Sequence, residues 1–322
     1  MKNLRVVGLL VVLGVAIASW SLTCAAWQFD KVAAGVMPLD PRDFPRFTLV
    51  TLGTGGAYEN PERRGPSTAV CLGQSVLLVD AGRGVAESLR AAKFPTRQPE
   101  TVLLTNLLPE NTVGLDDLLL TGWLDGRTEP LRLVGPAGTR ELAEALEASA
   151  RRGVEARAAV LGLDPAGARY EVLEIDDGWS EPRGDLGVRA AALSGGPLPA
   201  LAYRFDWQGR SAVISGTGWA PDALVGFAQG ASLLVHEAAF IPTPEIAEEI
   251  GLDMDPERLR GEAALHTSIE NVGDLATRSG VDTLVLVRLR PPPVFALQLT
   301  RPIGQTFDGR IRIAEDGDEF TP

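Results

Sequence analysis

The sequence contains little histidine, cysteine or clustered basic charge, and each shortage limits the sites that it can build. Only two histidines and two cysteines occur in 322 residues. Two cysteines do not indicate a disulfide framework, and Cys71, inside an apolar segment, is expected to be a small buried hydrophobe. The net charge is -12, and no run of Lys and Arg compensates for it. We therefore expect no nucleic-acid partner, since phosphate backbones are held mainly by clustered basic side chains.

One long uncharged segment is present at the N-terminus. Lys2 and Arg5 precede residues 6–27, which carry no charge and are long enough to cross a bilayer as a helix. As a transmembrane anchor, this segment would attach the chain to the cytoplasmic membrane with the domain outside. As a cleaved signal peptide, it would release a periplasmic or secreted protein. Lipidation of Cys24 is a third alternative.

These signals divide the chain into three parts. Residues 1–27 are the anchor or signal peptide, residues 28–45, which contain three prolines, are a linker, and residues 46–322 are one domain. With 45% hydrophobic and 22% charged residues, the chain can bury a large core.

The domain first alternates short apolar segments with turns and later with helical patterns. Expected strands occupy residues 47–52, 68–72, 76–80, 101–105, 131–134, 170–175, 188–193, 201–206, 211–215, 232–237 and 283–287. Expected helices occupy residues 84–92, 116–124, 139–152, 222–228 and 268–279. This order predicts an α/β fold (mixed α+β) in which two mixed β-sheets pack face to face and are flanked by helices.

Residues 102–115, VLLTNLLPENTVGL, have the frame of a metal-binding loop without its ligands. The stretch resembles the Thr-His-x-His-x-Asp-His motif, followed by Gly-Leu, of metallo-β-lactamase-fold hydrolases of the ribonuclease Z and arylsulfatase-like type. The frame is kept at Thr105, Gly114 and Leu115. The ligand positions of the motif are taken by Asn106, Leu108, Glu110 and Asn111.

The resemblance covers most of residues 47–318. Seven segments match the family in order: 52–70, 76–84, 120–142, 202–224, 233–240, 266–287 and 307–320. The resemblance implies the four-layer αββα metallo-β-lactamase sandwich.

The remaining departures from the family also fall on metal ligands. Leu193 to Gly195 stand where a histidine is expected, Thr217 replaces the bridging aspartate, and Arg288 lies near the last histidine. A zinc site needs imidazole, thiolate or carboxylate donors that converge on one ion. We therefore expect no cofactor, and zinc or another divalent metal only if ligands come from elsewhere in the chain.

Both histidines lie in segments that the resemblance places beside the reaction centre. His236 and Glu237 belong to a His-Glu-Ala segment, and His266 to a His-Thr-Ser segment. The resemblance implies that these three assist proton transfer or hold a phosphate. The alternative is a hydrogen-bonded structural cluster.

Two further residues are candidates for ligand binding. Asp80 ends an apolar strand, and it either supports the metal loop, as the resemblance implies, or caps a turn. Arg288, together with Arg290, either binds a small anionic ligand or pairs with Glu110 or Glu237.

Weaker signals have simpler explanations. Asp116 and Asp117 can join Asp80 and Glu110 around a hard ion, or they can begin a helix. Ser215 and Ser268 lack a nucleophile elbow, so serine hydrolysis is not favoured. Residues 53–56 lack the features of a phosphate-binding loop and are expected to form a tight turn.

The favoured hypothesis is a non-catalytic binding or scaffolding member of the superfamily, a pseudoenzyme that is membrane-anchored or exported. The alternative is a hydrolase of phosphodiesters or other esters that uses a relocated metal or the cluster of His236, Glu237 and His266. The sequence does not predict the oligomeric state.

Overall fold

A computed structural model describes residues 2–58, 60–216, 221–290 and 295–322. The chain forms two units, Met1–Asp40 and Pro41–Pro322. In the first unit, α1 (Lys2–Val36) contains the span Val12–Phe29, which is apolar and long enough to cross a membrane. The segment expected as a linker, residues 28–45, is helical up to Val36 and reaches the first strand at Phe44, because its first proline comes only after the helix ends.

The first sheet of the second unit has seven strands. The strands β1, β2 and β3 are antiparallel neighbours, whereas β3 to β6 run parallel. In spatial order the strands are β14 (Glu319–Phe320), β1 (Phe44–Gly53), β2 (Ser67–Gly73), β3 (Ser75–Val79), β4 (Thr101–Leu103), β5 (Leu131–Gly135) and β6 (Tyr170–Glu174).

The second sheet also has seven strands. Its first part, β7 to β10, is antiparallel, and its second part, β10 to β13, is parallel. In spatial order the strands are β13 (Arg310–Ile313), β12 (Thr283–Arg290), β11 (Leu233–Ala239), β10 (Arg210–Ser215), β9 (Ala200–Trp207), β8 (Leu186–Leu193) and β7 (Ser180–Arg183).

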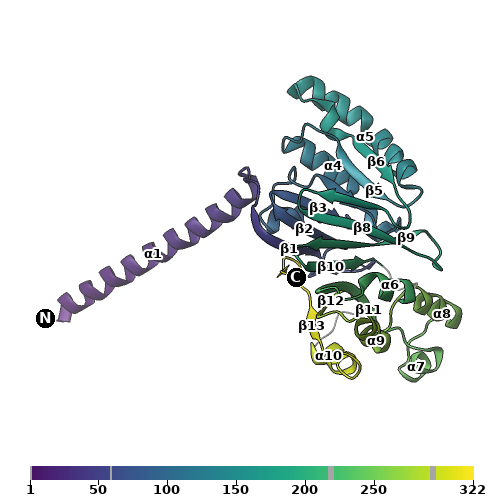
Figure 1. Cartoon of the computed structure of the whole chain (residues 1–322). Helices are drawn as coiled ribbons and strands as arrows, with labels where there is room; N and C mark the ends of the chain where they lie inside the picture. The colour runs from purple at the N-terminus through teal and green to yellow at the C-terminus, as the bar shows by residue number, and fades with distance from the viewer. Residues whose placement is uncertain (1, 59, 217–220, 291–294) are drawn as a thin grey trace. The chain divides into compact units, whose positions relative to one another are not determined.

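Helices cover the outer faces of both sheets (Figure 1). The first sheet carries α2 (Val85–Ala91), α3 (Pro109–Thr112), α4 (Leu115–Leu124), α5 (Thr139–Leu161) and the short η1 (Pro165–Ala168). The second sheet carries α6 (Pro221–Ala228), α7 (Pro244–Glu249), α8 (Pro256–Leu265), α9 (Ile269–Ser279) and α10 (Leu297–Ile303). The predicted sandwich of two mixed sheets flanked by helices is confirmed.

The period-two pattern of the strands divides the core into layers. In β1, Phe47 and Leu49 point into the layer between the sheets, while Val50 and Leu52 face the helices of the first sheet. Tyr203 of the second sheet fills the same central layer and is fully buried. Because successive side chains alternate faces, each strand contributes to two apolar layers. The polar residues that follow the strands are left at one end of the sandwich.

Candidate functional site

The ends of four segments meet at this end of the sandwich. Asp80 follows β3 directly, Thr105 follows β4, and Asn111 lies in α3. Parallel strands place their carboxyl ends on one edge, which is why residues that follow β3 and β4 come together. Arg288 reaches the same place from β12 in the other sheet, and its backbone N–H donates to the carbonyl oxygen of Thr54 at 2.7 Å. The candidate centre therefore joins the two sheets.

Asp80 is held in this centre by Thr105. The carboxylate is buried, and its Oδ1 accepts the backbone N–H of Thr105 at 2.8 Å. The hydroxyl of Thr105 lies 2.8 Å from Oδ2 and 3.0 Å from Oδ1. Asp80 has a φ of 63°, in the left-handed region that aspartate tolerates better than most residues.

Arg288 is the cation of this centre. Its Nη2 donates to Oδ2 of Asp80 at 2.5 Å, and its Nη1 donates to Oδ1 of Asn111 at 2.6 Å. The side chain is only 10% exposed, so both bonds lie in a region that excludes most water. Arg288 also has a positive φ, 53°, and such strained backbone concentrates at functional sites. The expected alternatives, pairing with Glu110 or Glu237, are wrong, because Asp80 and Asn111 take the guanidinium.

Two buried amides continue the network. Oδ1 of Asn106 accepts Nδ2 of Asn111 at 2.6 Å and the backbone N–H of Leu108 at 2.9 Å. These two donors fix which end of the Asn106 amide is oxygen. Nδ2 of Asn106 is then left buried without a partner among the described residues. Leu108 packs against the apolar layer under α9.

Arg288 controls the charge of Asp80. Burial raises the pKa of Asp80, and the charge of Arg288 and the hydrogen bonds from Thr105 oppose that rise. Burial outweighs these contributions, so the pKa of Asp80 is raised, and Arg288 is the charged group that favours its ionised form.

A second polar cluster lies at the ends of β11 and α8. Oε2 of Glu237 is 2.7 Å from Nδ1 of His266, and Oε1 of Glu237 accepts the backbone N–H of Thr267 at 3.2 Å. Burial lowers the pKa of His266, but the hydrogen bond and charge of Glu237 outweigh it, so that this pKa is raised. The geometry joins a buried carboxylate to a partly exposed imidazole that can carry a proton.

His236 belongs to the same cluster but differs in character. Its Nε2 lies 2.8 Å from the hydroxyl of Thr267, and its Nδ1 has no partner among the described residues. Burial lowers its pKa to about 4, with Arg288 adding to the shift and Glu237 opposing it. His236 is therefore a neutral, fully buried ring.

Arg290, Glu262 and Tyr58 lie at the rim of this cluster, and of these only Arg290 was a candidate in the sequence. Arg290 donates from Nη1 to Oε2 of Glu262 at 2.5 Å and from Nη2 to the hydroxyl of Tyr58 at 3.1 Å. Its guanidinium also lies 4.5 Å from the centre of the Tyr58 ring. Nε2 of His266 is 3.5 Å from Nη1 of Arg290. Glu262 precedes His266 by one helical turn, which is the one signal that could have found it.

The structure separates the other sequence candidates from this centre. Asp116 and Asp117 are exposed in the first turn of α4, as a helix start requires. Ser268 caps α9, since its hydroxyl accepts the backbone N–H of Asn271 at 3.3 Å. Glu110 forms no salt bridge with the residues that the structure describes. Thr217 lies outside the described residues.

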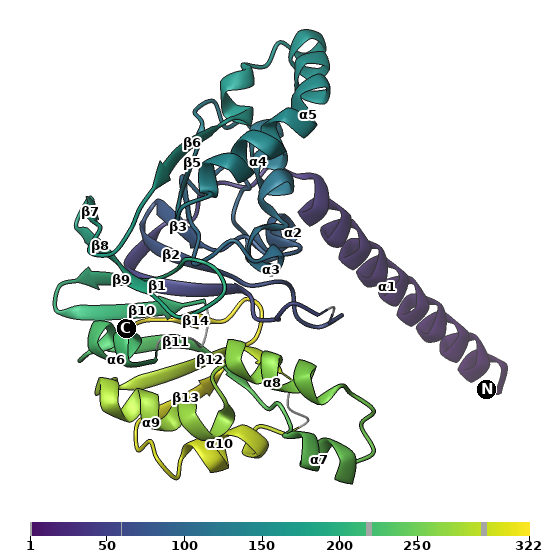
Figure 2. The same cartoon turned by 90° about the vertical axis from the view of Figure 1, so that its right-hand side faces the viewer.

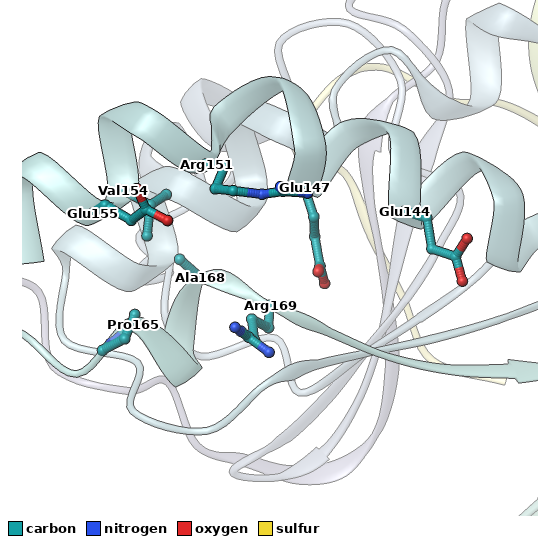
Figure 3. A pocket seen from close by; sticks show the side chains of 8 residues that line it. All are labelled: Glu144, Glu147, Arg151, Val154, Glu155, Pro165, Ala168 and Arg169. Carbon is teal, nitrogen blue, oxygen red and sulfur yellow. The ribbon is translucent and has the colours of Figure 1, made fainter.

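A separate groove lies beside α5 (Figure 3). It measures about 650 Å³. Arg151 and Glu147 from α5 and Arg169 from the segment before β6 line it, together with Glu144, Val154, Glu155, Pro165 and Ala168. None of the predicted site residues is among them.

Curated relatives match most of the chain, although no family model matches it. A ribonuclease Z from Mycobacterium avium is 33% identical over 274 residues, which cover 83% of this chain and 95% of the relative. A ribonuclease Z from Mycobacterium marinum is 31% identical over 274 residues, with 83% and 96% covered.

Solved structures share the fold. The metallo-β-lactamase fold protein YhfI from Bacillus subtilis has a TM-score of 0.67 at 18% identity and covers 86% of this chain and 99% of its own. The short form of human tRNase Z has a TM-score of 0.61 at 20% identity, with 85% and 98% covered. Zn(2+)-bound PqqB from Methylobacterium extorquens has a TM-score of 0.61 at 14% identity, with 85% and 100% covered.

The described side chains at this centre do not suit a zinc ion. Asn106 and Asn111 offer amide oxygens that are already occupied, and Leu108 offers no donor atom. The carboxylate of Asp80 is engaged by Arg288, whose positive charge would repel a second cation. In the described part of the chain, no three His, Cys, Asp or Glu side chains are grouped to hold a metal ion.

The expectation of no nucleic-acid partner is wrong, because the curated relatives are named ribonuclease Z and a solved neighbour is a tRNase Z. A net charge sums the whole chain, whereas an RNA-processing protein meets its substrate at one local site. Identity above 30% over most of both chains shows the family. This chain belongs to the ribonuclease Z family of metallo-β-lactamase-fold proteins.

Proposed function

We propose that this chain is a non-catalytic member of its family, which keeps the sandwich and binds a ligand without hydrolysing it. One observation carries the proposal. The guanidinium of Arg288 bridges Asp80 and Asn111 at 2.5 and 2.6 Å, at the centre where the family resemblance expects metal ligands.

Electrostatics supports this proposal. Asp80 and Arg288 form a buried pair whose formal charges cancel, so no excess negative charge remains there to attract a divalent ion. Without a metal, the centre lacks the means by which such enzymes lower the pKa of water and generate a nucleophile at neutral pH. Acid–base groups alone contribute only about 10²- to 10⁴-fold to a rate.

We infer that the bound ligand carries an anionic group such as a phosphodiester, and RNA is the first to test because the relatives are named for it. Arg290 and, in its protonated form, His266 are partly exposed cationic groups of the site, with side chains 27% and 24% exposed. A phosphate accepts hydrogen bonds from both kinds of donor. Glu262 is paired with Arg290, so the bound phosphate would have to displace its carboxylate from the guanidinium.

The alternative function is ester hydrolysis through the second cluster or a relocated metal. The contact of 2.7 Å between Glu237 and His266 favours it, because a carboxylate-oriented imidazole is a competent general acid or base. His236 does not strengthen this alternative, since it is neutral and enclosed. No activated nucleophile stands beside the pair among the residues that the structure describes.

We also propose that α1 keeps the protein at the membrane or directs its export. The span Val12–Phe29 supports both outcomes, and Lys2 and Arg5 in front of it favour an N-terminus in the cytoplasm. The mass of the N-terminal peptide from membrane and soluble fractions distinguishes an anchor from a cleaved signal.

Metal content and turnover test the function together. The full-length protein, purified in detergent without chelators or a histidine tag, is expected to hold less than about a tenth of an equivalent of Zn, Mn, Fe or Ni. We expect no hydrolysis of bis(p-nitrophenyl) phosphate or of a precursor tRNA, with or without added metal. The same tRNA should bind, and Arg290→Ala and His266→Ala should each weaken that binding.

Two results would contradict the proposal. Hydrolysis that Arg288→Ala leaves intact but His266→Ala abolishes would establish the alternative through the second cluster. One or two equivalents of metal that resist dialysis would establish a relocated metal site.

A further inference from the structure

The chain between β11 and α9 forms a small lobe, residues 240–265, which contains α7 and α8. Hydrogen bonds close its base: the backbone N–H of Ala239 donates to Thr267 O at 2.9 Å and that of Phe240 to Arg290 O at 2.6 Å. Figures 1 and 2 show α7 and α8 near each other, next to α9 and beyond the end of β11. The lobe is thus anchored at its base and free at its outer surface in the described structure.

A groove of about 480 Å³ lies in this lobe, between α7 and the turn into α8. Gly251, with a φ of 71°, ends α7, and the backbone N–H of Leu252 donates to Ala247 O at 2.8 Å. This cap turns the chain back along α7, so that the helix and the following turn form the two walls of the groove. The apolar lining consists of Pro244, Ala247, Leu252, Met254 and Pro256, and the acidic lining of Glu245, Glu248 and Asp253.

Apolar side chains extend from the groove onto the outer surface. Ile250 is 61% exposed and Leu252 is 40% exposed, although both are large aliphatic residues. Ile246, one turn before Ile250, is 38% exposed. Scattered exposed aliphatics are ordinary, but several beside one groove mark a contact surface.

Negative charge dominates the lining of the groove, whereas Arg258 and Arg260 follow it on α8. Every charged residue from Ile241 to Glu257 is acidic. Among the described residues, none of the three carboxylates that line the groove forms a salt bridge, although Arg260, which pairs with Glu257, also attracts Glu245. Glu248 and Asp253 are therefore the carboxylates available to cations from outside the chain.

We propose that this groove docks a cationic amphipathic segment of a partner protein. Lys and Arg side chains have apolar stems that match the proline, alanine and leucine floor, and charged ends that match the carboxylates at the rim. A second copy of this chain that docked through the same groove would bring the same carboxylates and be repelled, as would a nucleic acid or an anionic membrane. The site needs neither Arg288 nor His266, so it goes beyond the proposed function.

A synthetic peptide tests the docking site on the full-length protein in an uncharged detergent. The probe is a helical peptide of about 15 residues with a leucine face and a lysine face. We expect it to bind, and Glu248→Lys combined with Asp253→Lys to weaken binding by about tenfold or more. Ile250→Ser should also weaken it. The matched control, Glu144→Lys combined with Glu155→Lys, reverses two exposed charges on α5 and should change binding by less than about twofold.

Four results would overturn the proposal. Equal binding of a peptide with the same composition in scrambled order, or equal loss in both double variants, would show general charge attraction only. Self-association that Ile250→Ser abolishes in sedimentation would assign the groove to a second copy. Binding to phosphatidylserine vesicles that Ile250→Ser abolishes would assign it to lipid.

Discussion

Arg288 shows how a single side chain changes the chemistry of a centre. Its guanidinium is fixed by two short bonds, and its partner Asp80 is almost completely buried. A buried pair contributes little net stability when intact, because both charges have been taken out of water. Removal of one partner is costly, because the other charge then stays buried without compensation.

Arg288→Ala is therefore expected to lower the free energy of unfolding by about 3–5 kcal/mol, as measured by urea denaturation. Arg189→Ala is the control, because Arg189 pairs with Asp206 at the surface with its side chain 51% exposed. That change should cost less than about 1 kcal/mol. Arg288→Met combined with Asp80→Asn should recover part of the loss, since neither charge is left alone. Equal costs for the two arginines would contradict a buried ion pair.

His236 gives the protein a defined sensitivity to acid. Its pKa falls from 6.5 to about 4 on folding, so the folded state disfavours protonation of this ring. The stability that this provides is complete above pH 6.5 and decreases as the pH falls toward 4. The loss amounts to about 3 kcal/mol at pH 4.

The measurement is the free energy of unfolding of the wild type and of His236→Gln between these two pH values. The wild type should lose more stability than the variant on acidification. His266, whose pKa is raised, acts in the opposite direction, so the comparison with His236→Gln isolates the buried ring. Parallel curves for the two proteins would show that His236 does not titrate in this way.

At the scale of elements, glycine-rich loops lock the ends of the strands together beneath the centre. A Cβ atom on Gly82 would lie 2.5 Å from backbone atoms of Gly65 and Pro66 and 2.7 Å from the carbonyl oxygen of Glu110. The three segments therefore touch backbone to backbone. The sequence does not predict this contact, because the three segments are distant in the chain.

Gly82→Ala should lower the free energy of unfolding by about 1–3 kcal/mol, because the added methyl group meets rigid backbone on several sides. Gly153→Ala is the matched control, since Gly153 lies in the middle of α5 with nothing within 4 Å of its Cβ position. That change should stabilise the protein by up to about 1 kcal/mol. If both changes stabilise the protein, the close packing of the loops is incorrect.

Helices and strands with a strong apolar pattern in the sequence were predicted, and those with a weak pattern were missed. The long apolar strands, such as 47–52 and 283–287, were predicted within a few residues, because burial on both faces leaves a continuous apolar run. The helices α7 and α8 and the short strands β7, β13 and β14 were missed, since polar residues dominate them. The helix α5 was predicted to end at Arg152 and continues to Leu161, because exposed Gly153 does not break it.

The sequence indicated most residues of the candidate site but not which of them contact each other. Asp80, Glu237, His266 and Arg288 were all candidates, and the pair of Glu237 and His266 was expected to converge. The partner of Arg288 was not predictable, because 208 positions separate it from Asp80 and several carboxylates were plausible. The packing of the two sheets decides which carboxylate meets Arg288, and a local sequence pattern does not predict that packing.

At the scale of the whole molecule, the net charge was a poor guide to binding partners. The net charge of -12 conceals an uneven surface: every charged side chain in residues 241–257 is acidic, whereas Arg290 and His266 lie at the rim of the centre. Ligands respond to the local field, which a total charge does not describe. Relatives named for RNA processing are therefore compatible with an acidic chain.

The arginine at the centre also changes what the protein requires from its surroundings. A metal ion occupies a site according to its free concentration, and a chelator or a poor supply can leave that site empty. A guanidinium that is part of the chain arrives with synthesis and cannot dissociate. Under the proposed function, the centre would thus be complete as soon as the chain has folded, at any supply of metal.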